Sequence, residues 1–153
     1  MVKRIITMVL CCSLITLFSP LSGSSPALAA GKDQTKVSNA TGPGASPQLT
    51  ASHLFKVSYT TEPAQIPLNA FHSWTLTVRT TEGTPVTDAE IEVSGGMPAH
   101  GHGLQSTPKV TKNSGNGTYL IEGIKFFMPG QWVMNFVIKS GGKEDKITFS
   151  VDL

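Results

Sequence analysis

WVMNFVIK, at residues 132–139, alternates large apolar side chains with smaller or polar ones at every second position. Trp132, Met134, Phe136 and Ile138 share one parity of this alternation. Successive side chains of a β-strand point to opposite faces of the sheet, so one face of this segment would be apolar. The pattern therefore predicts a strand that buries one face in a core.

The same alternation recurs between Ser52 and Leu153, over about a hundred residues, which is enough for one small domain. Further strands are expected at 55–59, 74–79, 88–93 and 146–153, with weaker candidates at 109–112 and 117–126. Clusters of turn-forming residues separate these segments, and no amphipathic helix is visible. About seven short strands predict an all-β fold, an immunoglobulin-like β-sandwich, with Trp74 and Trp132 both buried.

Residues 1–30 have the pattern of a secretory signal peptide. Lys3 and Arg4 precede an apolar run at 5–18, and Ala27-Leu28-Ala29 offers small residues at the spacing of a cleavage site. The apolar run is short for a membrane span, although an uncleaved N-terminal anchor is the alternative. We therefore expect a periplasmic or secreted protein with no permanent membrane span after cleavage.

Residues 31–51 form the next segment, rich in Gly, Pro, Ser and Thr and without apolar periodicity. This composition predicts a disordered linker, followed by the domain at residues 52–153. Both cysteines, Cys11 and Cys12, lie in the expected signal peptide, so the exported chain would contain no thiol and no disulfide. A metal site in that chain would have to use histidine, methionine, carboxylate or backbone ligands.

The net charge of the exported chain argues against two classes of partner. Ten of the twelve lysines and arginines remain once Lys3 and Arg4 are removed, and they face ten acidic residues. A formally neutral protein lacks the basic surface that nucleic-acid binding requires. It also gains no general attraction to acidic membrane surfaces.

The sequence GGMPAHGHG, at residues 95–103, holds two of the four histidines of the chain. Its glycines and its proline favour a shaped loop over the interior of a helix or strand. Met97, His100 and His102 supply one thioether and two imidazoles, a donor set that suits copper, with zinc as a weaker alternative. The competing interpretation is a glycine-rich turn with solvated histidines, or with Met97 as a hydrophobic plug.

Strand order predicts that other donors lie near this loop. If consecutive strands run up and down, the first, third and fifth connections meet at one end of the sandwich. These connections bring His72, the 95–103 loop and Met128 to that end. His72 could instead be a hydrogen-bonded histidine at the core margin, and Met128 could serve packing. We assign Met134 to the core.

Catalytic motifs are not found. The chain lacks the G-x-S-x-G nucleophile elbow, a phosphate-binding P-loop and the H-E-x-x-H zinc motif, and the exported part has no cysteine nucleophile. We therefore expect a protein that is not an enzyme.

Several segments resemble one known family. His72-Ser73-Trp74, Pro85-Val86-Thr87-Asp88-Ala89, GGMPAHGHG, Gly117-Thr118-Tyr119 and Phe127-Met128-Pro129-Gly130-Gln131-Trp132 resemble the small exported YtkA-like domains, which are related to the periplasmic part of FixH-type proteins. The resemblance covers roughly residues 54–153. It implies an immunoglobulin-like sandwich without enzymatic activity. FixH-type proteins are associated with copper supply to haem–copper oxidase assembly, but this chain lacks their evident membrane helix.

These observations lead to two functional hypotheses. In the first, the domain binds copper through Met97, His100 and His102, with Met128 and His72 as further candidate ligands, and passes it to a recipient or membrane-complex protein. In the second, the same loop is a metal-free module that docks on an exported enzyme or membrane complex.

Overall fold

The computed structural model describes residues 38–40 and 44–153. The expected signal peptide, and residues 31–37 and 41–43 of the expected linker, lie outside the described residues. None of the helical structure in the described part is long and apolar enough to cross a membrane. The elements, in chain order, are β1 (Ser38–Ala40), β2 (Gly44–Leu49), β3 (Phe55–Glu62), β4 (His72–Thr80), β5 (Glu90–Met97), the 3₁₀ turn η1 (Pro98–His100), β6 (His102–Gly103), β7 (Lys109–Asn113), β8 (Thr118–Ile124), β9 (Gln131–Ser140) and β10 (Lys143–Asp152).

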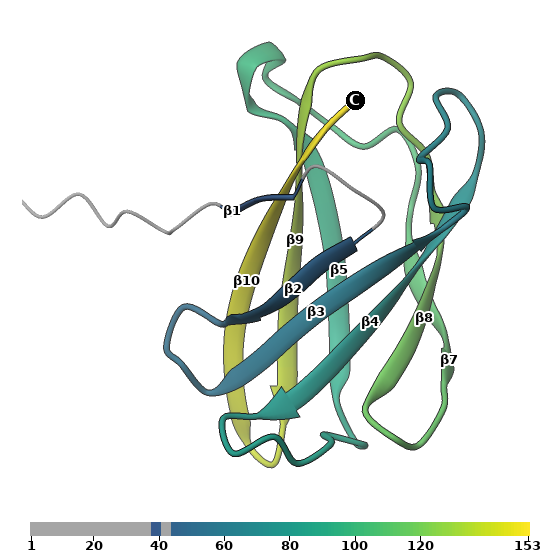
Figure 1. Cartoon of the computed structure of the whole chain (residues 1–153). Coiled ribbons are helices and arrows are strands. Elements are labelled where there is room, and N and C mark those ends of the chain that lie inside the picture. The colour runs from purple at the N-terminus through teal and green to yellow at the C-terminus, as the bar shows by residue number, and fades with distance from the viewer. Residues whose placement is uncertain (1–37, 41–43) are drawn as a thin grey trace, which may run out of the picture. The chain divides into compact units, whose positions relative to one another are not determined.

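The strands form two five-stranded sheets, with the orders β1-β10-β9-β5-β6 and β2-β3-β4-β8-β7. Neighbouring strands are antiparallel, except that β1 runs parallel to β10. Figure 1 shows the two sheets as packed layers. The expected all-β, immunoglobulin-like sandwich is confirmed. The seven expected strands are β3, β4, β5, β7, β8, β9 and β10, and the structure adds β1, β2 and β6.

The core lies between the sheets and is built from the apolar parity of each strand. In β4 and β9 every second side chain is buried, as the alternation predicts. Trp74 and Trp132 are both fully buried, which confirms that prediction. The Tyr59 ring of β3 stacks on Trp74 of β4 with ring centroids 4.0 Å apart.

The structure differs from the expected linker at residues 44–51. Gly44–Leu49 forms β2, which pairs with β3 at the edge of the second sheet. A Cβ atom at Gly44 would lie 2.3 Å from the carbonyl oxygen of Tyr59, so only glycine allows this close approach. The register shifts between Ala45 and Gln48, and this irregularity accommodates Pro47.

Residues 50–55 are held to β10 by the buried carboxylate of Asp145. The hydroxyl of Thr50 donates to Asp145 Oδ2 at 2.5 Å, and the backbone N–H groups of Ser52 and Leu54 donate to the same carboxylate at about 3 Å. Burial alone would raise the pKa of Asp145, but these hydrogen bonds together hold it below its usual value. The ordered structure therefore begins well before Ser52.

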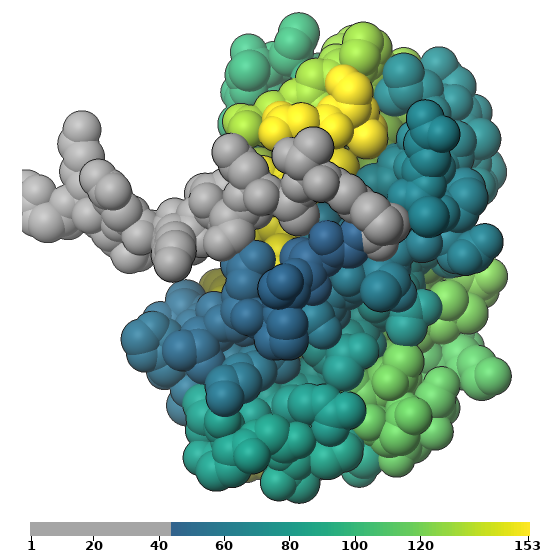
Figure 2. Space-filling model, in the orientation of Figure 1, coloured from purple at the N-terminus to yellow at the C-terminus, as the bar shows by residue number. Residues whose placement is uncertain are grey.

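Three connections meet at one end of the sandwich, the upper end in Figure 1. They are the β3–β4 connection, the segment from β5 through η1 to β6, and the β8–β9 connection. At this end Gly130 and Leu153 exchange two backbone hydrogen bonds of 2.8 and 3.1 Å. Figure 2 shows the C-terminal residues in yellow beside the yellow-green residues of the β8–β9 connection. The predicted meeting of the first, third and fifth connections is therefore confirmed.

Candidate metal-binding site

The hairpin formed by β5, η1 and β6 carries Met97, His100 and His102. Gly96 lies so close to β6 that a Cβ atom there would be 2.5 Å from the carbonyl oxygen of His102. Gly101 ends η1 in the left-handed conformation, with φ of 68°, and its N–H donates to the Met97 carbonyl at 3.0 Å. The glycines therefore produce a tight reversal in which Met97 and His102 are direct partners.

His102 lies among rings from two connections. Its ring centroid is 5.7 Å from that of His100, 5.1 Å from that of Phe127 and 5.8 Å from that of Trp132. Both ring nitrogens of His102 are inaccessible to solvent and have no hydrogen-bond partner among the described residues. His100, by contrast, is exposed. The hairpin thus holds one covered imidazole with two free nitrogens beside one accessible imidazole.

The β8–β9 connection closes the other side of this group. Phe127 contacts His102, and Gly130 lies against the end of Met97, since a Cβ atom at Gly130 would be 2.8 Å from the Met97 methyl carbon. Met128, between these two contacts, is partly buried and packs on the core. Its carbonyl oxygen accepts a hydrogen bond from Trp132 Nε1 at 3.0 Å. Met128 therefore lies in the chain between Phe127, which contacts His102, and Gly130, which lies against Met97.

His72 is placed differently from the other four candidate ligands. It is buried at the start of β4, and its ring contacts Phe126 with centroids 5.2 Å apart. The ring contacts that join His72 to His102 pass through Phe126 and Trp132. Burial lowers the pKa of His72, partly offset by the contact between Nδ1 and the Ala70 carbonyl at 3.4 Å. Its Nε2 is buried and has no hydrogen-bond partner among the described residues.

The donor set is small. No three His, Cys, Asp or Glu side chains of the described residues gather in a way that could hold a metal ion. The hairpin instead offers two imidazoles, with the thioether of Met97 beside one of them. Such a set is too sparse for a closed structural zinc site, which takes four ligands.

A family model described as YtkA-like matches residues 54–136. The chain belongs to the YtkA-like family. The match confirms the resemblance seen in the sequence, and it includes Met97, His100, His102, Met128 and His72. No curated protein matches.

Two solved structures are similar to this YtkA-like chain at low identity. One is described as the crystal structure of the S-layer protein SbsC domains 4 and 5, with 20% identity, a TM-score of 0.33 and coverage of 56% of this chain. The chain spans 45% of the length of that structure. The other, the ZirS C-terminal domain, has 14% identity and a TM-score of 0.37, with 93% of this chain and 88% of that chain covered.

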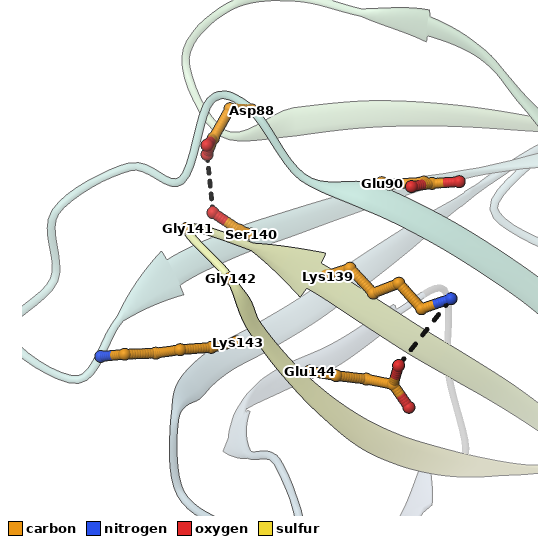
Figure 3. A pocket seen from close by; sticks show the side chains of 8 residues that line it. All are labelled: Asp88, Glu90, Lys139, Ser140, Gly141, Gly142, Lys143 and Glu144. Carbon is orange, nitrogen blue, oxygen red and sulfur yellow. Dashed lines mark hydrogen bonds and ion pairs between the residues drawn. The ribbon is translucent and has the colours of Figure 1, made fainter.

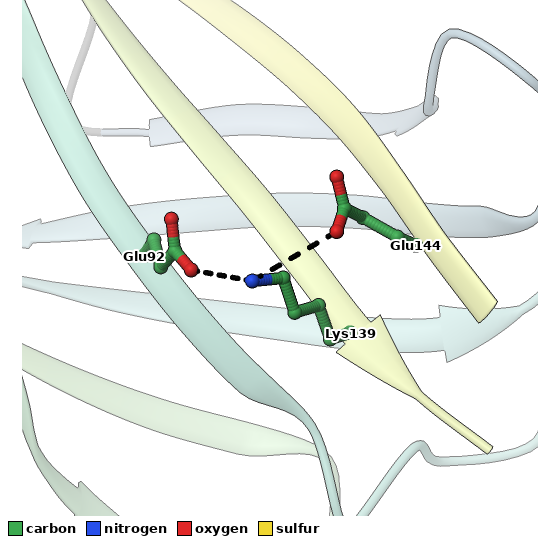
Figure 4. A network of polar contacts seen from close by, with 3 residues as sticks. All are labelled: Glu92, Lys139 and Glu144. Carbon is green, nitrogen blue, oxygen red and sulfur yellow. Dashed lines mark hydrogen bonds and ion pairs between the residues drawn. The ribbon is translucent and has the colours of Figure 1, made fainter. Parts of the chain in front are cut away.

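The opposite end of the YtkA-like domain carries an open, charged surface. A hollow of about 410 Å³ surrounds the β9–β10 turn, with Asp88, Ser140 and Lys143 in its lining (Figure 3). Lys139 forms ion pairs with Glu92 at 2.5 Å and Glu144 at 3.8 Å across the outer face of the sheet (Figure 4). The hydrogen bond from Lys139 lowers the pKa of Glu92. These exposed pairs are ordinary surface interactions.

The sequence pattern does not predict the two aromatic residues that contact His102, Phe127 and Trp132. The alternation places Trp132 in the core and gives no role to Phe127. One signal was available in the sequence, namely that Phe127 and Trp132 flank Met128. Trp132 lies at the start of β9, and its Nε1 donates to the carbonyl oxygen of Met128 in the preceding connection.

Proposed function

We propose that this YtkA-like domain is an exported, non-enzymatic protein that binds copper through the β5–η1–β6 hairpin and passes it to another protein. The observation that carries the proposal is His102, whose two ring nitrogens are covered yet have no hydrogen-bond partner. A buried polar group without a partner costs about 1–3 kcal/mol. A metal ion at one of these nitrogens would satisfy its lone pair, while the other nitrogen would keep its proton.

The residues around His102 favour copper over zinc. His100 lies beside His102, and Met97 is its partner across the strand pair. The soft thioether beside borderline imidazoles favours Cu(I), whereas structural zinc sites take four ligands, chiefly thiolate and imidazole. Met128, on the connection that covers this group, is a second thioether. We leave His72 out of the proposed ligand set, because its ring contacts reach His102 only through Phe126 and Trp132.

Transfer of the ion fits the position of the hairpin. His100 is exposed at the end of the sandwich, so an incoming protein could contact it directly. A site with few ligands also releases its ion more readily than a closed tetrahedral one. The recipient would be a copper protein or a membrane complex outside the cytoplasm, in line with the family assignment.

A competitive titration of residues 31–153 with Cu(I), Cu(II) and Zn(II) tests the proposal. The double variant His100→Ala, His102→Ala should lose copper binding and keep its fold, because His100 is exposed and His102, although it contacts Phe127 and Trp132, is only partly buried. The matched control is His53→Ala, which changes an exposed histidine outside the hairpin. If the wild-type protein takes up no more copper than the double variant, the proposal is wrong.

The metal-free docking module is the second candidate function, and one observation favours it. Phe71 is 69% exposed and Leu68 is 43% exposed, and both lie on the β3–β4 connection at the same end of the domain. Lys125 lies over the Phe71 ring, 5.6 Å from its centroid. The partner would be an exported protein with an apolar, acidic contact surface. Loss of that partner in Phe71→Ser, combined with an absence of copper uptake by the wild-type protein, would favour this function.

A further inference from the structure

The indole of Trp132 lies where the β8–β9 connection meets the hairpin. Its ring centroid is 5.0 Å from Phe126, 5.1 Å from Phe127 and 5.8 Å from His102. The side chain is fully buried. One rigid ring therefore contacts residues on both sides of the candidate metal site.

The single donor of this indole is used on the connection itself. Trp132 Nε1 donates to the carbonyl oxygen of Met128 at 3.0 Å. The other tryptophan, Trp74, is equally buried, but its Nε1 has no hydrogen-bond partner among the described residues. The two tryptophans are thus equally buried, but only the indole N–H of Trp132 donates a hydrogen bond to the backbone.

The connection is fixed at its other end as well. Gly130 exchanges two backbone hydrogen bonds with Leu153, and a Cβ atom added at Gly130 would lie 2.8 Å from the methyl carbon of Met97. Between Phe127, which contacts His102, and Gly130, which contacts Met97, the hydrogen bond from Trp132 holds the backbone of Met128. Loss of this bond alone would release the Met128 carbonyl, whereas an aromatic ring kept at position 132 would preserve the contact with His102.

We propose that Trp132 is a positioning residue that holds Met128 beside the hairpin and thereby makes the site select Cu(I). This inference rests on the proposed copper-binding function and adds a second thioether to it. Cu(I) gains from a thioether ligand, whereas Cu(II) and Zn(II) rely on the imidazoles. Trp132 would therefore raise the affinity for Cu(I) relative to the affinities for Cu(II) and Zn(II), and would not strengthen the binding of all three ions.

The test compares Trp132→Phe with Trp74→Phe, in the same chain of residues 31–153. Trp132→Phe keeps an aromatic ring and loses the N–H, so its affinity for Cu(I) should fall about tenfold, the effect of losing one hydrogen bond of about 1.4 kcal/mol. Its affinity for Zn(II) should stay within about twofold. Trp74→Phe should leave both affinities unchanged. Equal losses in the two variants, or no loss in Trp132→Phe, would overturn the inference.

A double-mutant cycle separates positioning from general destabilisation. Met128→Leu removes the thioether and conserves volume, so the domain should remain folded. If Trp132 acts through Met128, the double variant Trp132→Phe, Met128→Leu should bind Cu(I) no more weakly than Met128→Leu alone. Additive losses would contradict the inference, even where Trp132→Phe lowers stability.

Copper-dependent quenching of tryptophan fluorescence in the folded protein supplies a further readout. The chain has two tryptophans, so each variant leaves a single emitter. Copper should quench Trp132 in Trp74→Phe and leave Trp74 unquenched in Trp132→Phe, since only Trp132 contacts His102. Wild-type protein that takes up no copper would refute the proposed function and this inference together. Wild-type binding with unchanged selectivity in Trp132→Phe would refute the inference alone.

Discussion

Met97 and His102 stand directly opposite each other in the antiparallel β5–β6 pair, so their side chains leave the same face of the sheet. Opposed residues of such a pair have Cβ atoms about 4.5–5.5 Å apart. The thioether and the imidazole are therefore brought together by backbone pairing, which depends on Gly96 and Gly101 and not on the flexibility of a loop. Because the two side chains are already held together, metal binding would not require the loss of conformational entropy that ordering them would cost.

Met97→Leu should weaken Cu(I) binding on the order of 10–100-fold and change Zn(II) binding little, because it removes the soft ligand and keeps the volume. Competitive titration with both ions measures the effect. Met134→Leu is the control, since Met134 is buried in the same core cluster as Met97 but is paired with Gly95 and not with His102. Equal Cu(I) affinities for the two variants would exclude Met97 as a ligand.

The N-terminal boundary of the folded domain gives the second prediction. A chain that begins at Gly44 should be more stable than one that begins at Ser52 by about 2–4 kcal/mol, because the shorter chain loses β2 and the Thr50 hydroxyl that donates to Asp145. Chemical denaturation of the two truncated proteins measures the difference. In limited proteolysis the segment 44–50 should be protected, and cleavage there in the native protein would contradict this assignment.

Asp145→Asn tests the carboxylate separately from the strand. The wild-type carboxylate has a lowered pKa, so its contribution to stability is present above the usual aspartate range, near pH 4, and is lost as the pH falls through the lower folded value. The variant should therefore be less stable at pH 7 and should lose less stability on acidification. Thermal unfolding from pH 7 to pH 2 checks both effects, and parallel curves for the two proteins would contradict the prediction.

The strands were predictable because each buries one face, so the core appears in the sequence as strict alternation. Strand β2 escaped prediction for a physical reason: it is an edge strand, and its Gly44 and Pro47 serve close approach and a bulge. In the candidate site, the meeting of the connections followed from strand order alone. The wall formed by Phe127 and Trp132 did not, because ring contacts depend on side-chain directions that a period-two pattern leaves open.

Trp74→Ala should destabilise the domain by about 3–5 kcal/mol, as expected for removal of a large buried aromatic side chain. Trp74 is fully buried, and the Tyr59 ring stacks on it with an interplanar angle of 11°. Denaturant unfolding measures the loss. The exposed Phe71→Ala should change stability by less than about 0.5 kcal/mol and is the matched aromatic control. An unchanged midpoint for Trp74→Ala would contradict the assigned core.

His72 makes the stability of the metal-free domain depend on pH. Burial lowers the pKa of its imidazole below the usual value of 6.5, so between the folded and the unfolded pKa the unfolded chain binds more protons than the folded one. Stability is therefore complete above about pH 6.5 and declines as the pH falls from there toward the folded pKa. His72→Phe removes the titrating group and places an apolar ring beside Phe126, so its melting temperature should vary less over this range. Thermal unfolding between pH 7.5 and pH 5 compares the two proteins, with His53→Ala as the control that keeps His72. If His72→Phe keeps the wild-type pH dependence of the melting temperature, another group causes that dependence and the prediction is wrong.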